Sequence, residues 1–409
     1  IDQVRLFGGS VRFFVDLSVD DVPGTAGWRS VVAEGLAATA TGPVHLNVAL
    51  REPLVPDSVD SRAEPLGSTV EPPDPRPVPL PATPVEVARG PRTVVVAGDG
   101  AGPGARGLAE ANGWPLLAEP TSGARSGPNA LAAYRFLLAH LGADIERVVV
   151  AGRPTLSRPV TRLLARRDLE VVGVPAGRSV PTGEPAEPDV WLTGWLDADA
   201  SARAAMAEVL ADGPLSGPGA ARVVAAATGA GALLVAGSSS AVRDLDLADP
   251  WPADATVLAN RGASGIDGTV STAVGAALAH GGPAVALVGD LTFLHDVTGL
   301  VIGPDEPRPD LTVVVNNDDG GGLFALLEQG APEHADSFER LFGTPHGVDL
   351  AAVCAATHTA YELVATGDEL AAALSPATGV GVVEVRTDRT ASRDLHDRLR
   401  SAVAAALQV

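Results

Sequence analysis

Two apolar segments of the sequence end in oxygen-bearing side chains beside glycines. The run over 283–288 leads into Gly289 and Asp290, and the run over 311–315 leads into amides, acids and glycines over 316–322. Each run is typical of a buried parallel strand. Carboxylate and carbonyl oxygens suit a hard divalent cation, and glycine N–H groups suit phosphate. The pattern favours a magnesium-bound diphosphate at strand ends, where open α/β sheets bind ligands, over two acidic surface turns.

Two further polar, glycine-rich segments follow apolar runs in the same part of the chain. The segment 260–268 carries Arg261, which supplies a bidentate donor for a carboxylate or phosphate. The segment 237–244 offers hydroxyl and N–H groups that suit a phosphate. Each segment alone also fits an ordinary helix start. In a doubly wound sheet all these turns lie along one edge, so we expect a single site.

A competing motif lies earlier in the chain. Gly98-Asp99-Gly100, with more glycines up to 107, resembles a dinucleotide-binding loop. A lone glycine-rich loop is a weak signal, and no acid follows a second strand at the spacing that a dinucleotide fingerprint requires. We interpret it as a turn, and an NAD- or FAD-binding oxidoreductase built on residues 91–107 stays an alternative.

Composition narrows the class of protein. The 409 residues carry a net charge of −21, which argues against a broad nucleic-acid or anionic-membrane surface. Every basic side chain among the 29 is arginine. The single cysteine, Cys354, lies in an apolar helical pattern and fits a reducing cytoplasm. No apolar stretch reaches the length of a membrane span.

Strand and helix patterns alternate, which predicts an α/β protein with doubly wound parallel sheets. We expect a partial domain over 1–52, a proline-rich linker over 53–90, a central α/β domain over 91–212 and a last domain over 213–409. The expected strands are 43–50, 93–97, 147–151, 170–174, 191–195, 232–236, 255–258, 283–288, 311–315 and 380–385. The expected helices are 28–38, 129–141, 157–167, 267–280 and 291–302.

Three motifs carry a resemblance to a known family. The segments 260–268, 289–296 and 319–324 resemble those of 2-succinyl-5-enolpyruvyl-6-hydroxy-3-cyclohexene-1-carboxylate (SEPHCHC) synthases, the thiamine-diphosphate enzymes of menaquinone biosynthesis. Segments 1–8, 42–53 and 342–346 are also similar, so the resemblance covers the whole chain. It implies three domains and a dimer or tetramer with active sites at subunit interfaces. Residues 1–52 would end the pyrimidine-binding domain, and the cofactor-activating glutamate would precede Ile1.

The resemblance also implies roles for individual residues. Asp290, Asp318 and the Gly320 carbonyl would bind Mg²⁺ or Mn²⁺, although counting from the preceding strand would select Asn317 instead of Asp318. Many relatives have asparagine at the position of Asp318. The residues that would contact the cofactor are Ser239, Ile266, Gly289, Asp290, Leu291, Thr292, Asn317 and Gly320. The residues that would contact substrate are Arg158, Arg243, Arg261, Phe324 and Leu327, and those assigned to catalysis are Arg243, Arg261, Ile266 and Phe324.

The implied reaction decarboxylates 2-oxoglutarate and adds the succinyl carbanion to isochorismate in a 1,4-addition. Both substrates are dicarboxylates, which explains arginines in an acidic protein. Another thiamine-diphosphate lyase or synthase, similar to acetolactate synthase, is an alternative, but pyruvate needs less cationic help. A non-catalytic nucleotide-binding or scaffold fragment is the third reading.

Overall fold

The computed structural model describes residues 3–18, 24–49, 90–175, 186–252, 255–375 and 378–408. The chain divides into two compact units, Ile1–Pro84 and Val85–Val409, and each is described by itself. The predicted proline-rich linker, apart from Gly90, lies outside the described residues.

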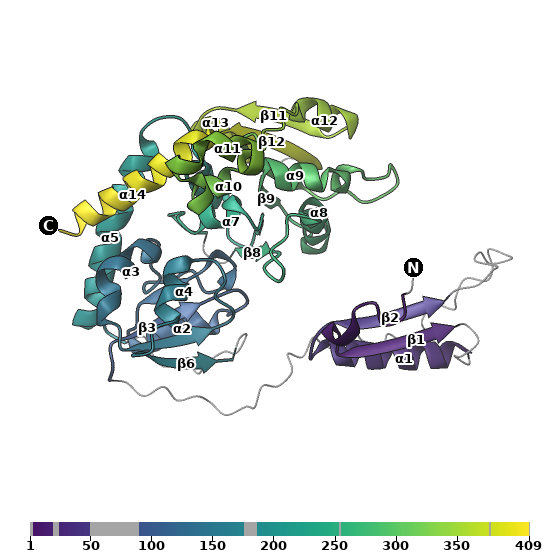
Figure 1. Ribbon diagram of the computed structural model, residues 1–409, viewed down its shortest axis with the longest axis horizontal. Helices are drawn as coiled ribbons and strands as arrows, with labels where there is room; N and C mark the ends of the chain where they lie inside the picture. Colours follow the sequence, from purple (N-terminus) through teal and green to yellow (C-terminus); the bar gives the residue numbers. More distant parts are fainter. Residues whose placement is uncertain are drawn as a thin grey trace. The chain divides into compact units, whose positions relative to one another are not determined.

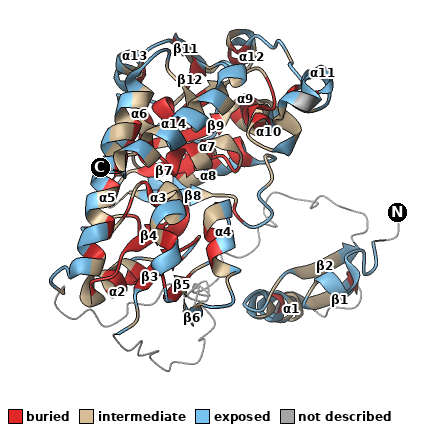
Figure 2. Ribbon diagram, turned by 60° about the vertical axis from the view of Figure 1, so that its left-hand side comes forward, coloured by how far each residue is buried: buried red, intermediate tan, exposed pale blue. Residues whose placement is uncertain are grey.

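The first unit contains two parallel strands and one helix. β1 (Phe13–Ser18) pairs with β2 (Val44–Ala49), and α1 (Gly24–Thr39) connects them. The predicted helix over 28–38 and the described part of the strand over 43–50 are confirmed. Most described side chains of this unit are half-buried or exposed (Figure 2).

The second unit is built on two parallel sheets (Figure 1). The central sheet has the order β4-β3-β5-β6 and comprises β3 (Thr93–Ala97), β4 (Leu116–Ala118), β5 (Arg147–Ala151) and β6 (Glu170–Val174). The larger sheet has the order β11-β12-β10-β9-β7-β8 and comprises β7 (Leu233–Ala236), β8 (Thr256–Ala259), β9 (Ala284–Gly289), β10 (Leu311–Asn317), β11 (Ala360–Val364) and β12 (Val380–Arg386).

Helices connect the strands of both sheets. Those of the central part are α2 (Gly104–Asn112), η3 (Pro120–Ser122), α3 (Tyr134–Leu141), α4 (Arg158–Leu164) and α5 (Val190–Ala211). The larger sheet carries α6 (Gly217–Ala227), α7 (Ser240–Leu245), α8 (Thr269–His280), α9 (Asp290–His295), η5 (Val297–Leu300), α10 (Gly322–Ala325), η6 (Glu328–Gly330), η7 (Pro332–His334), α11 (Ala335–Phe338), η8 (Glu339–Gly343), α12 (Leu350–Ala356), α13 (Gly367–Ala373), η9 (Arg389–Ala391) and α14 (Ser392–Ala406).

Both faces of the larger sheet are buried along its inner strands. Along β7, Leu234 packs with α6, α7 and α13 on one face, while Leu233 packs with α8, α9 and α12 on the other. This alternation is what a strand covered on both sides requires, and it explains the nearly continuous apolar runs. The doubly wound α/β architecture predicted from the sequence is confirmed, and buried residues concentrate in the strands (Figure 2).

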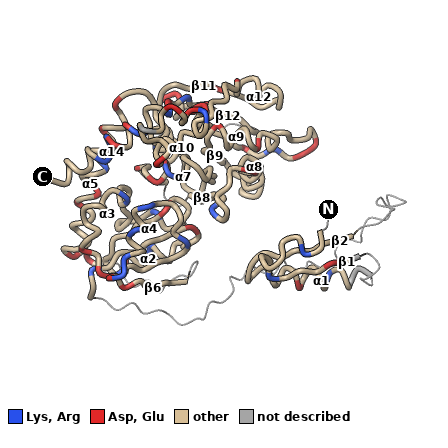
Figure 3. The backbone as a smooth tube through the Cα atoms, viewed as in Figure 1, with Lys and Arg blue, Asp and Glu red and all other residues tan. Residues whose placement is uncertain are grey.

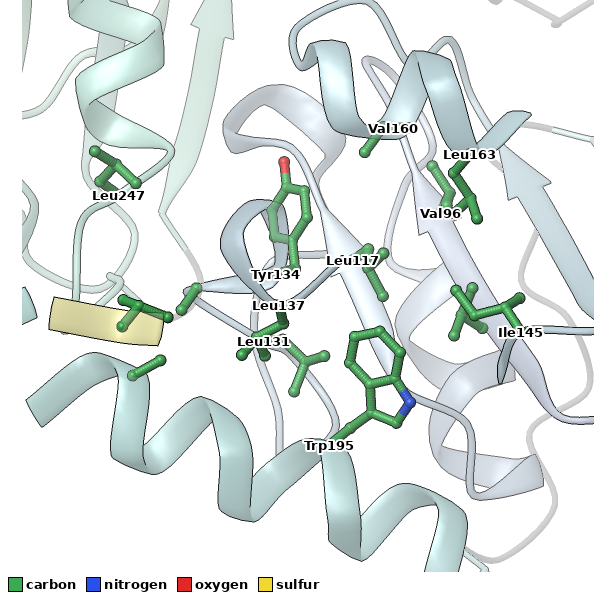
Figure 4. Close-up of a cluster of buried hydrophobic side chains, with 14 of the residues drawn as sticks. Val96, Leu117, Leu131, Tyr134, Leu137, Ile145, Val160, Leu163, Trp195 and Leu247 are labelled. Atoms are coloured by element: carbon green, nitrogen blue, oxygen red, sulfur yellow. The ribbon is translucent and has the colours of Figure 1, made fainter. Parts of the chain in front are cut away.

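One predicted strand is wrong. Residues 191–195 form the first turns of α5, whose N-cap Asp189 accepts a hydrogen bond from the Leu192 N–H. Trp191 and Trp195 are four residues apart, so both lie on one helix face, and their rings meet edge to face. The same spacing also fits a strand with alternating faces, which is why the sequence pattern predicted a strand here. Trp195 points into the central core beside Leu117 (Figure 4).

The other predicted strands are confirmed within their ends, whereas the strands β1, β4 and β11 were not predicted. The predicted helices over 157–167 and 267–280 are confirmed within their ends, the one over 129–141 begins only at Tyr134, and the one over 291–302 is divided into α9 and η5. Cys354 is buried in α12, as expected, and burial raises the pKa of its thiol to about 11. In the part of the chain that the structure describes, no helix combines the length and apolar character needed to cross a bilayer.

The Gly98 loop connects β3 to α2 in the central sheet. A Cβ atom at Gly98 would come within 2.1 Å of the backbone of Arg153, so this glycine permits close packing of two loops. Asp99 in turn forms an ion pair with Arg153.

The last helix returns to the central part of the molecule. α14 packs against α5 and contacts α3 (Figure 1). Leu399 and Val403 of α14 belong to the apolar cluster that also contains Tyr134 and Trp195. The two sheets are therefore joined by a helix that follows the larger sheet in sequence but completes the core beside the smaller one.

Candidate cofactor site

The predicted polar turns meet at one edge of the larger sheet. All its strands are parallel, and β9 lies between β7 and β10, with Gly289 opposite Asn316. The chain runs outward from β7 to β8 on one side and from β9 to β10 on the other, so the strand order reverses between β7 and β9. Such a switch point is where open α/β sheets bind ligands. The strands themselves carry few charges, which gather in the segments around them (Figure 3).

Asp290 is buried at the start of α9. Its Oδ1 accepts a hydrogen bond from the Leu291 N–H at 2.6 Å, and its Oδ2 accepts one from the Gly320 N–H at 2.8 Å and contacts Nε2 of His346 at 3.0 Å. Burial raises the pKa of this carboxyl, while these hydrogen bonds oppose the rise. The carboxylate is thus held in a fixed orientation at the edge of the sheet.

Asp318 lines the same cleft as Asp290, and one of its two carboxylate oxygens lacks a hydrogen-bond partner in the described residues. Its Oδ1 is buried and has no hydrogen-bond partner within the described residues. Burial, followed by the negative charge of Asp290, raises its pKa to about 7. A buried and a half-buried carboxylate that repel one another fit a divalent cation, which would neutralise both. No three His, Cys, Asp or Glu side chains converge as a metal site in the described residues, so further ligands would be carbonyl or phosphate oxygens.

Asn317, the alternative ligand, is engaged elsewhere. Its Nδ2 donates to Oε1 of Glu384 at 2.9 Å, and its Oδ1 accepts from the Asp319 N–H at 3.0 Å. Its amide group therefore fixes the turn against β12. This geometry favours Asp318 as the residue facing an ion.

The three glycines after Asp319 form a cradle that no larger residue fits. Cβ atoms at Gly320 and Gly321 would lie 1.9 and 2.1 Å from the carbonyl oxygens of Gly343 and Phe342, and Gly320 has a φ of 139°. The Gly321 N–H donates to the Gly343 carbonyl at 2.7 Å. The turn is consequently pressed against η8, and its glycines are required by that close backbone approach.

A cleft of about 490 Å³ opens above this turn. The predicted site residues that line it are Ser239, Arg243, Ile266, Gly289, Asp290, Leu291, Thr292, Asp318, Gly320 and Phe324. Those that are absent from its lining are Arg158, Arg261, Asn317 and Leu327.

Arg243 and Arg261 converge beside the cleft. Nη1 of each donates to the Ser238 carbonyl, at 3.2 Å for Arg243 and 3.4 Å for Arg261. Burial, followed by the neighbouring charge of Arg261, lowers the pKa of Arg243. Their hydrogen-bond partners in the described residues are backbone carbonyls and one hydroxyl, so no carboxylate there neutralises either charge at contact distance. Such a pair suits an anionic ligand.

Arg158 and Leu327 have partners outside the lining of the cleft. Arg158, at the start of α4, forms a two-pronged pair with Glu328 at 2.7 and 3.2 Å, and both side chains are exposed. This hydrogen-bonded pair lowers the pKa of Glu328 to about 2. The Leu327 carbonyl accepts a hydrogen bond from Arg393 at 2.6 Å. The structure therefore shows Arg158 paired with a carboxylate of its own chain.

Three residues at this site were not predicted from the sequence. His346 holds Asp290, and Arg389 donates to the carbonyls of Asp318 and Asp319 at 2.7 and 2.9 Å. Asn316 lines the cleft, and both polar atoms of its side chain are buried without a partner within the described residues. The motif over 342–346 was recognised, but nothing local pointed from it to Asp290.

His346 is expected to strengthen cofactor binding through Asp290. The Val348 N–H donates to Nδ1 of His346 at 3.0 Å, so Nε2 carries the proton and donates to the carboxylate. Loss of such a supporting hydrogen bond typically weakens metal affinity about 10-fold or more. We expect His346→Ala to weaken magnesium-dependent binding of thiamine diphosphate by about 10-fold in calorimetry. His346→Gln retains an N–H donor and is the control; equal weakening in both variants would contradict this role.

Part of the chain matches a known family, and its fold matches a solved structure. The family described as "Thiamine pyrophosphate enzyme, C-terminal TPP binding domain" matches residues 250–386, which include Asp290 and Asp318. The crystal structure of benzoylformate decarboxylase from Polynucleobacter necessarius is similar with a TM-score of 0.54 and 18% identity, over 94% of this chain and 77% of that one. At this identity the likeness shows the fold alone.

Two curated relatives are both named SEPHCHC synthase. A SEPHCHC synthase from Nocardioides sp. is 53% identical over 88% of this chain and 72% of its own length. A second, from Saccharopolyspora erythraea, is 45% identical over 100% of this chain and 78% of its own length. Together with the thiamine-diphosphate fold and the strand-end site, these similarities show that the chain belongs to the SEPHCHC synthases, thiamine-diphosphate-dependent transferases of menaquinone biosynthesis.

Proposed function

We propose that the protein decarboxylates 2-oxoglutarate and adds the succinyl unit to isochorismate by 1,4-addition. Thiamine diphosphate, when bound, supplies the electron sink that decarboxylation of a 2-oxo acid requires. The residues of the chain would bind and orient the reactants. The observation that carries the proposal is the convergence of two carboxylates, a glycine turn and Arg243 at one cleft, with Arg261 beside Arg243 at the Ser238 carbonyl.

The metal and diphosphate would be held at the strand ends. Asp290, Asp318 and the Gly320 carbonyl would bind Mg²⁺ or Mn²⁺, supported by the unpartnered Oδ1 of Asp318 and the mutual repulsion of the two acids. The residues assigned to the rest of the cofactor are Ser239, Ile266, Gly289, Leu291 and Thr292, which all line the cleft. Asn317 would contribute by fixing the turn.

The substrate carboxylates would meet arginine. Arg243 lines the cleft, and Arg261 lies beside it with a side chain that no carboxylate contacts directly in the described part of the chain. Phe324 lines the apolar side, with Leu327 beyond it. Arg158 would join the site once it exchanges Glu328 for a substrate carboxylate. A dicarboxylate substrate needs such donors more than pyruvate does, which disfavours an activity similar to that of acetolactate synthase.

The assembly and location follow from the same proposal. We propose self-association with the active site at the subunit interface, and a cytoplasmic location, in line with the free, buried Cys354. Residues 1–52 would belong to a pyrimidine-binding domain, 91–212 to a central domain and 213–409 to the diphosphate-binding domain, with 53–90 as linker.

The full-length protein provides the test. With thiamine diphosphate and Mg²⁺, it is expected to convert isotopically labelled 2-oxoglutarate and isochorismate into a labelled SEPHCHC product that mass spectrometry detects. Omission of either the cofactor or the metal is expected to abolish the product. Formation of acetolactate from pyruvate at a comparable kcat/KM would favour the alternative enzyme instead.

A further inference from the structure

A buried carboxylate in the central sheet holds a loop that reaches the arginine pair. Glu119 follows β4 directly and is 2% exposed. Its Oε1 accepts hydrogen bonds from the N–H groups of Thr155 and Leu156, both at 2.9 Å, and its Oε2 lies 3.2 Å from the Thr155 N. These contacts fix the loop between β5 and α4 as it leaves the sheet.

The same loop holds Arg261 from the other side. The hydroxyl of Thr155 accepts hydrogen bonds from Nε and Nη2 of Arg261, at 3.3 and 3.1 Å. The Thr155 carbonyl accepts another from Nη2 at 3.2 Å. Three of the contacts that orient this guanidinium therefore come from a single residue of the central loop, and Ser238 provides a fourth.

We infer that Glu119 is a positioning residue for substrate recognition, acting through Thr155 on Arg261. The inference rests on the proposed function, because it concerns the arginine that would bind a substrate carboxylate. The path runs through hydrogen bonds only: Glu119 fixes the backbone N–H groups of the loop, and the loop fixes the guanidinium. The loop continues into Ser157 and Arg158 at the start of α4. Its position therefore also sets the position of the Arg158 backbone.

The cost of burying Glu119 supports a functional reason for keeping it. Burial raises the pKa of its carboxyl to about 7, with the N–H group of Leu156 as the largest opposing influence. Asp246 raises the pKa further, whereas the charge of Arg261 lowers it. Apolar side chains would fill this space at lower cost, so the acid is better explained by the loop it holds.

The test uses kinetics of the full-length protein with thiamine diphosphate and Mg²⁺. Glu119→Ala and Thr155→Val are each expected to raise the KM for isochorismate at least 5-fold, while the affinity for thiamine diphosphate changes less than 2-fold. Thr155→Val exchanges a hydroxyl for a methyl group of similar size on an exposed residue, so it remains informative if Glu119→Ala folds poorly. Thr155→Ser keeps the hydroxyl and is expected to behave like the wild type.

A double-mutant cycle distinguishes positioning from general damage. In an Arg261→Ala background, Thr155→Val is expected to add no further rise in KM, because its target is already absent. Additive effects would overturn the inference. Glu146→Ala is the matched control, since this exposed acid accepts the Arg92 N–H at the opposite edge of the central sheet; it is expected to leave KM unchanged.

Hydrogen exchange separates this inference from the proposed function. The Leu156 amide is expected to exchange at least 10-fold faster in Glu119→Ala than in the wild type, in the protein loaded with thiamine diphosphate and Mg²⁺. Absence of wild-type turnover would refute the proposed function. The exchange rate would then decide the inference alone, and an unchanged rate at Leu156 would overturn it.

Discussion

Replacement of Asp290 with alanine is expected to weaken magnesium-dependent binding of thiamine diphosphate by at least about 100-fold. Losing even a residue that supports a metal ligand commonly costs 10–100-fold in affinity, and Asp290 is assigned as a ligand itself. The substitution also leaves the N–H of Gly320 and Nε2 of His346 without their acceptor inside the protein. Isothermal titration calorimetry with and without Mg²⁺ measures the effect.

Two comparisons make this result specific. Asp310→Ala removes an acid that precedes β10, at the opposite end of the strand from Asp318, and is expected to leave cofactor affinity unchanged. Asp318→Asn keeps an oxygen ligand and is expected to retain binding that Asp318→Ala loses. Cofactor affinity of Asp290→Ala equal to that of the wild type would show that the strand-end acids do not anchor the diphosphate.

Replacement of Arg261 with alanine is expected to lower kcat/KM for isochorismate by about 100-fold. A hydrogen bond to a charged group contributes about 1.5–3 kcal/mol, and 1.4 kcal/mol corresponds to a factor of ten. The upper end of this free-energy range applies because Arg261 is buried. Its removal also frees Thr155 from the guanidinium, so the loop before α4 loses a contact. The affinity for thiamine diphosphate is expected to stay within about 2-fold, because Asp290 and the glycine turn remain.

Steady-state kinetics and cofactor titration on the same preparations measure the effect on kcat/KM separately from the effect on cofactor affinity. Arg308→Ala is the matched control, because this exposed arginine precedes β10 and does not line the cleft. Arg261→Lys keeps the charge but not the forked donor, and we expect it to recover only part of the loss. An unchanged kcat/KM in Arg261→Ala would exclude a substrate role for this side chain.

The sequence was sufficient for the strand ends because two local signals combine there. Continuous apolar runs identify strands that are buried on both faces, and a parallel sheet brings all their carboxyl ends to one edge. Asp290 and the polar segment 316–319 could therefore be placed together without knowledge of their contacts, while the choice of Asp318 within that segment came from the family resemblance. The structure adds the reason for preferring Asp318 to Asn317, namely the hydrogen bonds that Asn317 makes with Glu384 and Asp319.

Other residues carry no such local signal. His346 reaches Asp290 across 56 residues, and Glu119 reaches Thr155 across 36. Their types are ordinary and their neighbours show no periodicity that would announce the contact, so only the folded chain reveals it. The error at Trp191 and Trp195 has a different origin, because a spacing of four residues satisfies both a strand and a helix over so short a segment.

The position of α14 bears on the order in which the protein acquires its structure during synthesis. The ribosome releases β3, α3 and α5 long before Leu399 and Val403, which complete the apolar cluster around Tyr134 and Trp195. Until then, part of that cluster is exposed to water, as in other long chains whose early segments wait for late partners. The nascent central sheet therefore keeps part of its apolar surface uncovered until α14 has been synthesised.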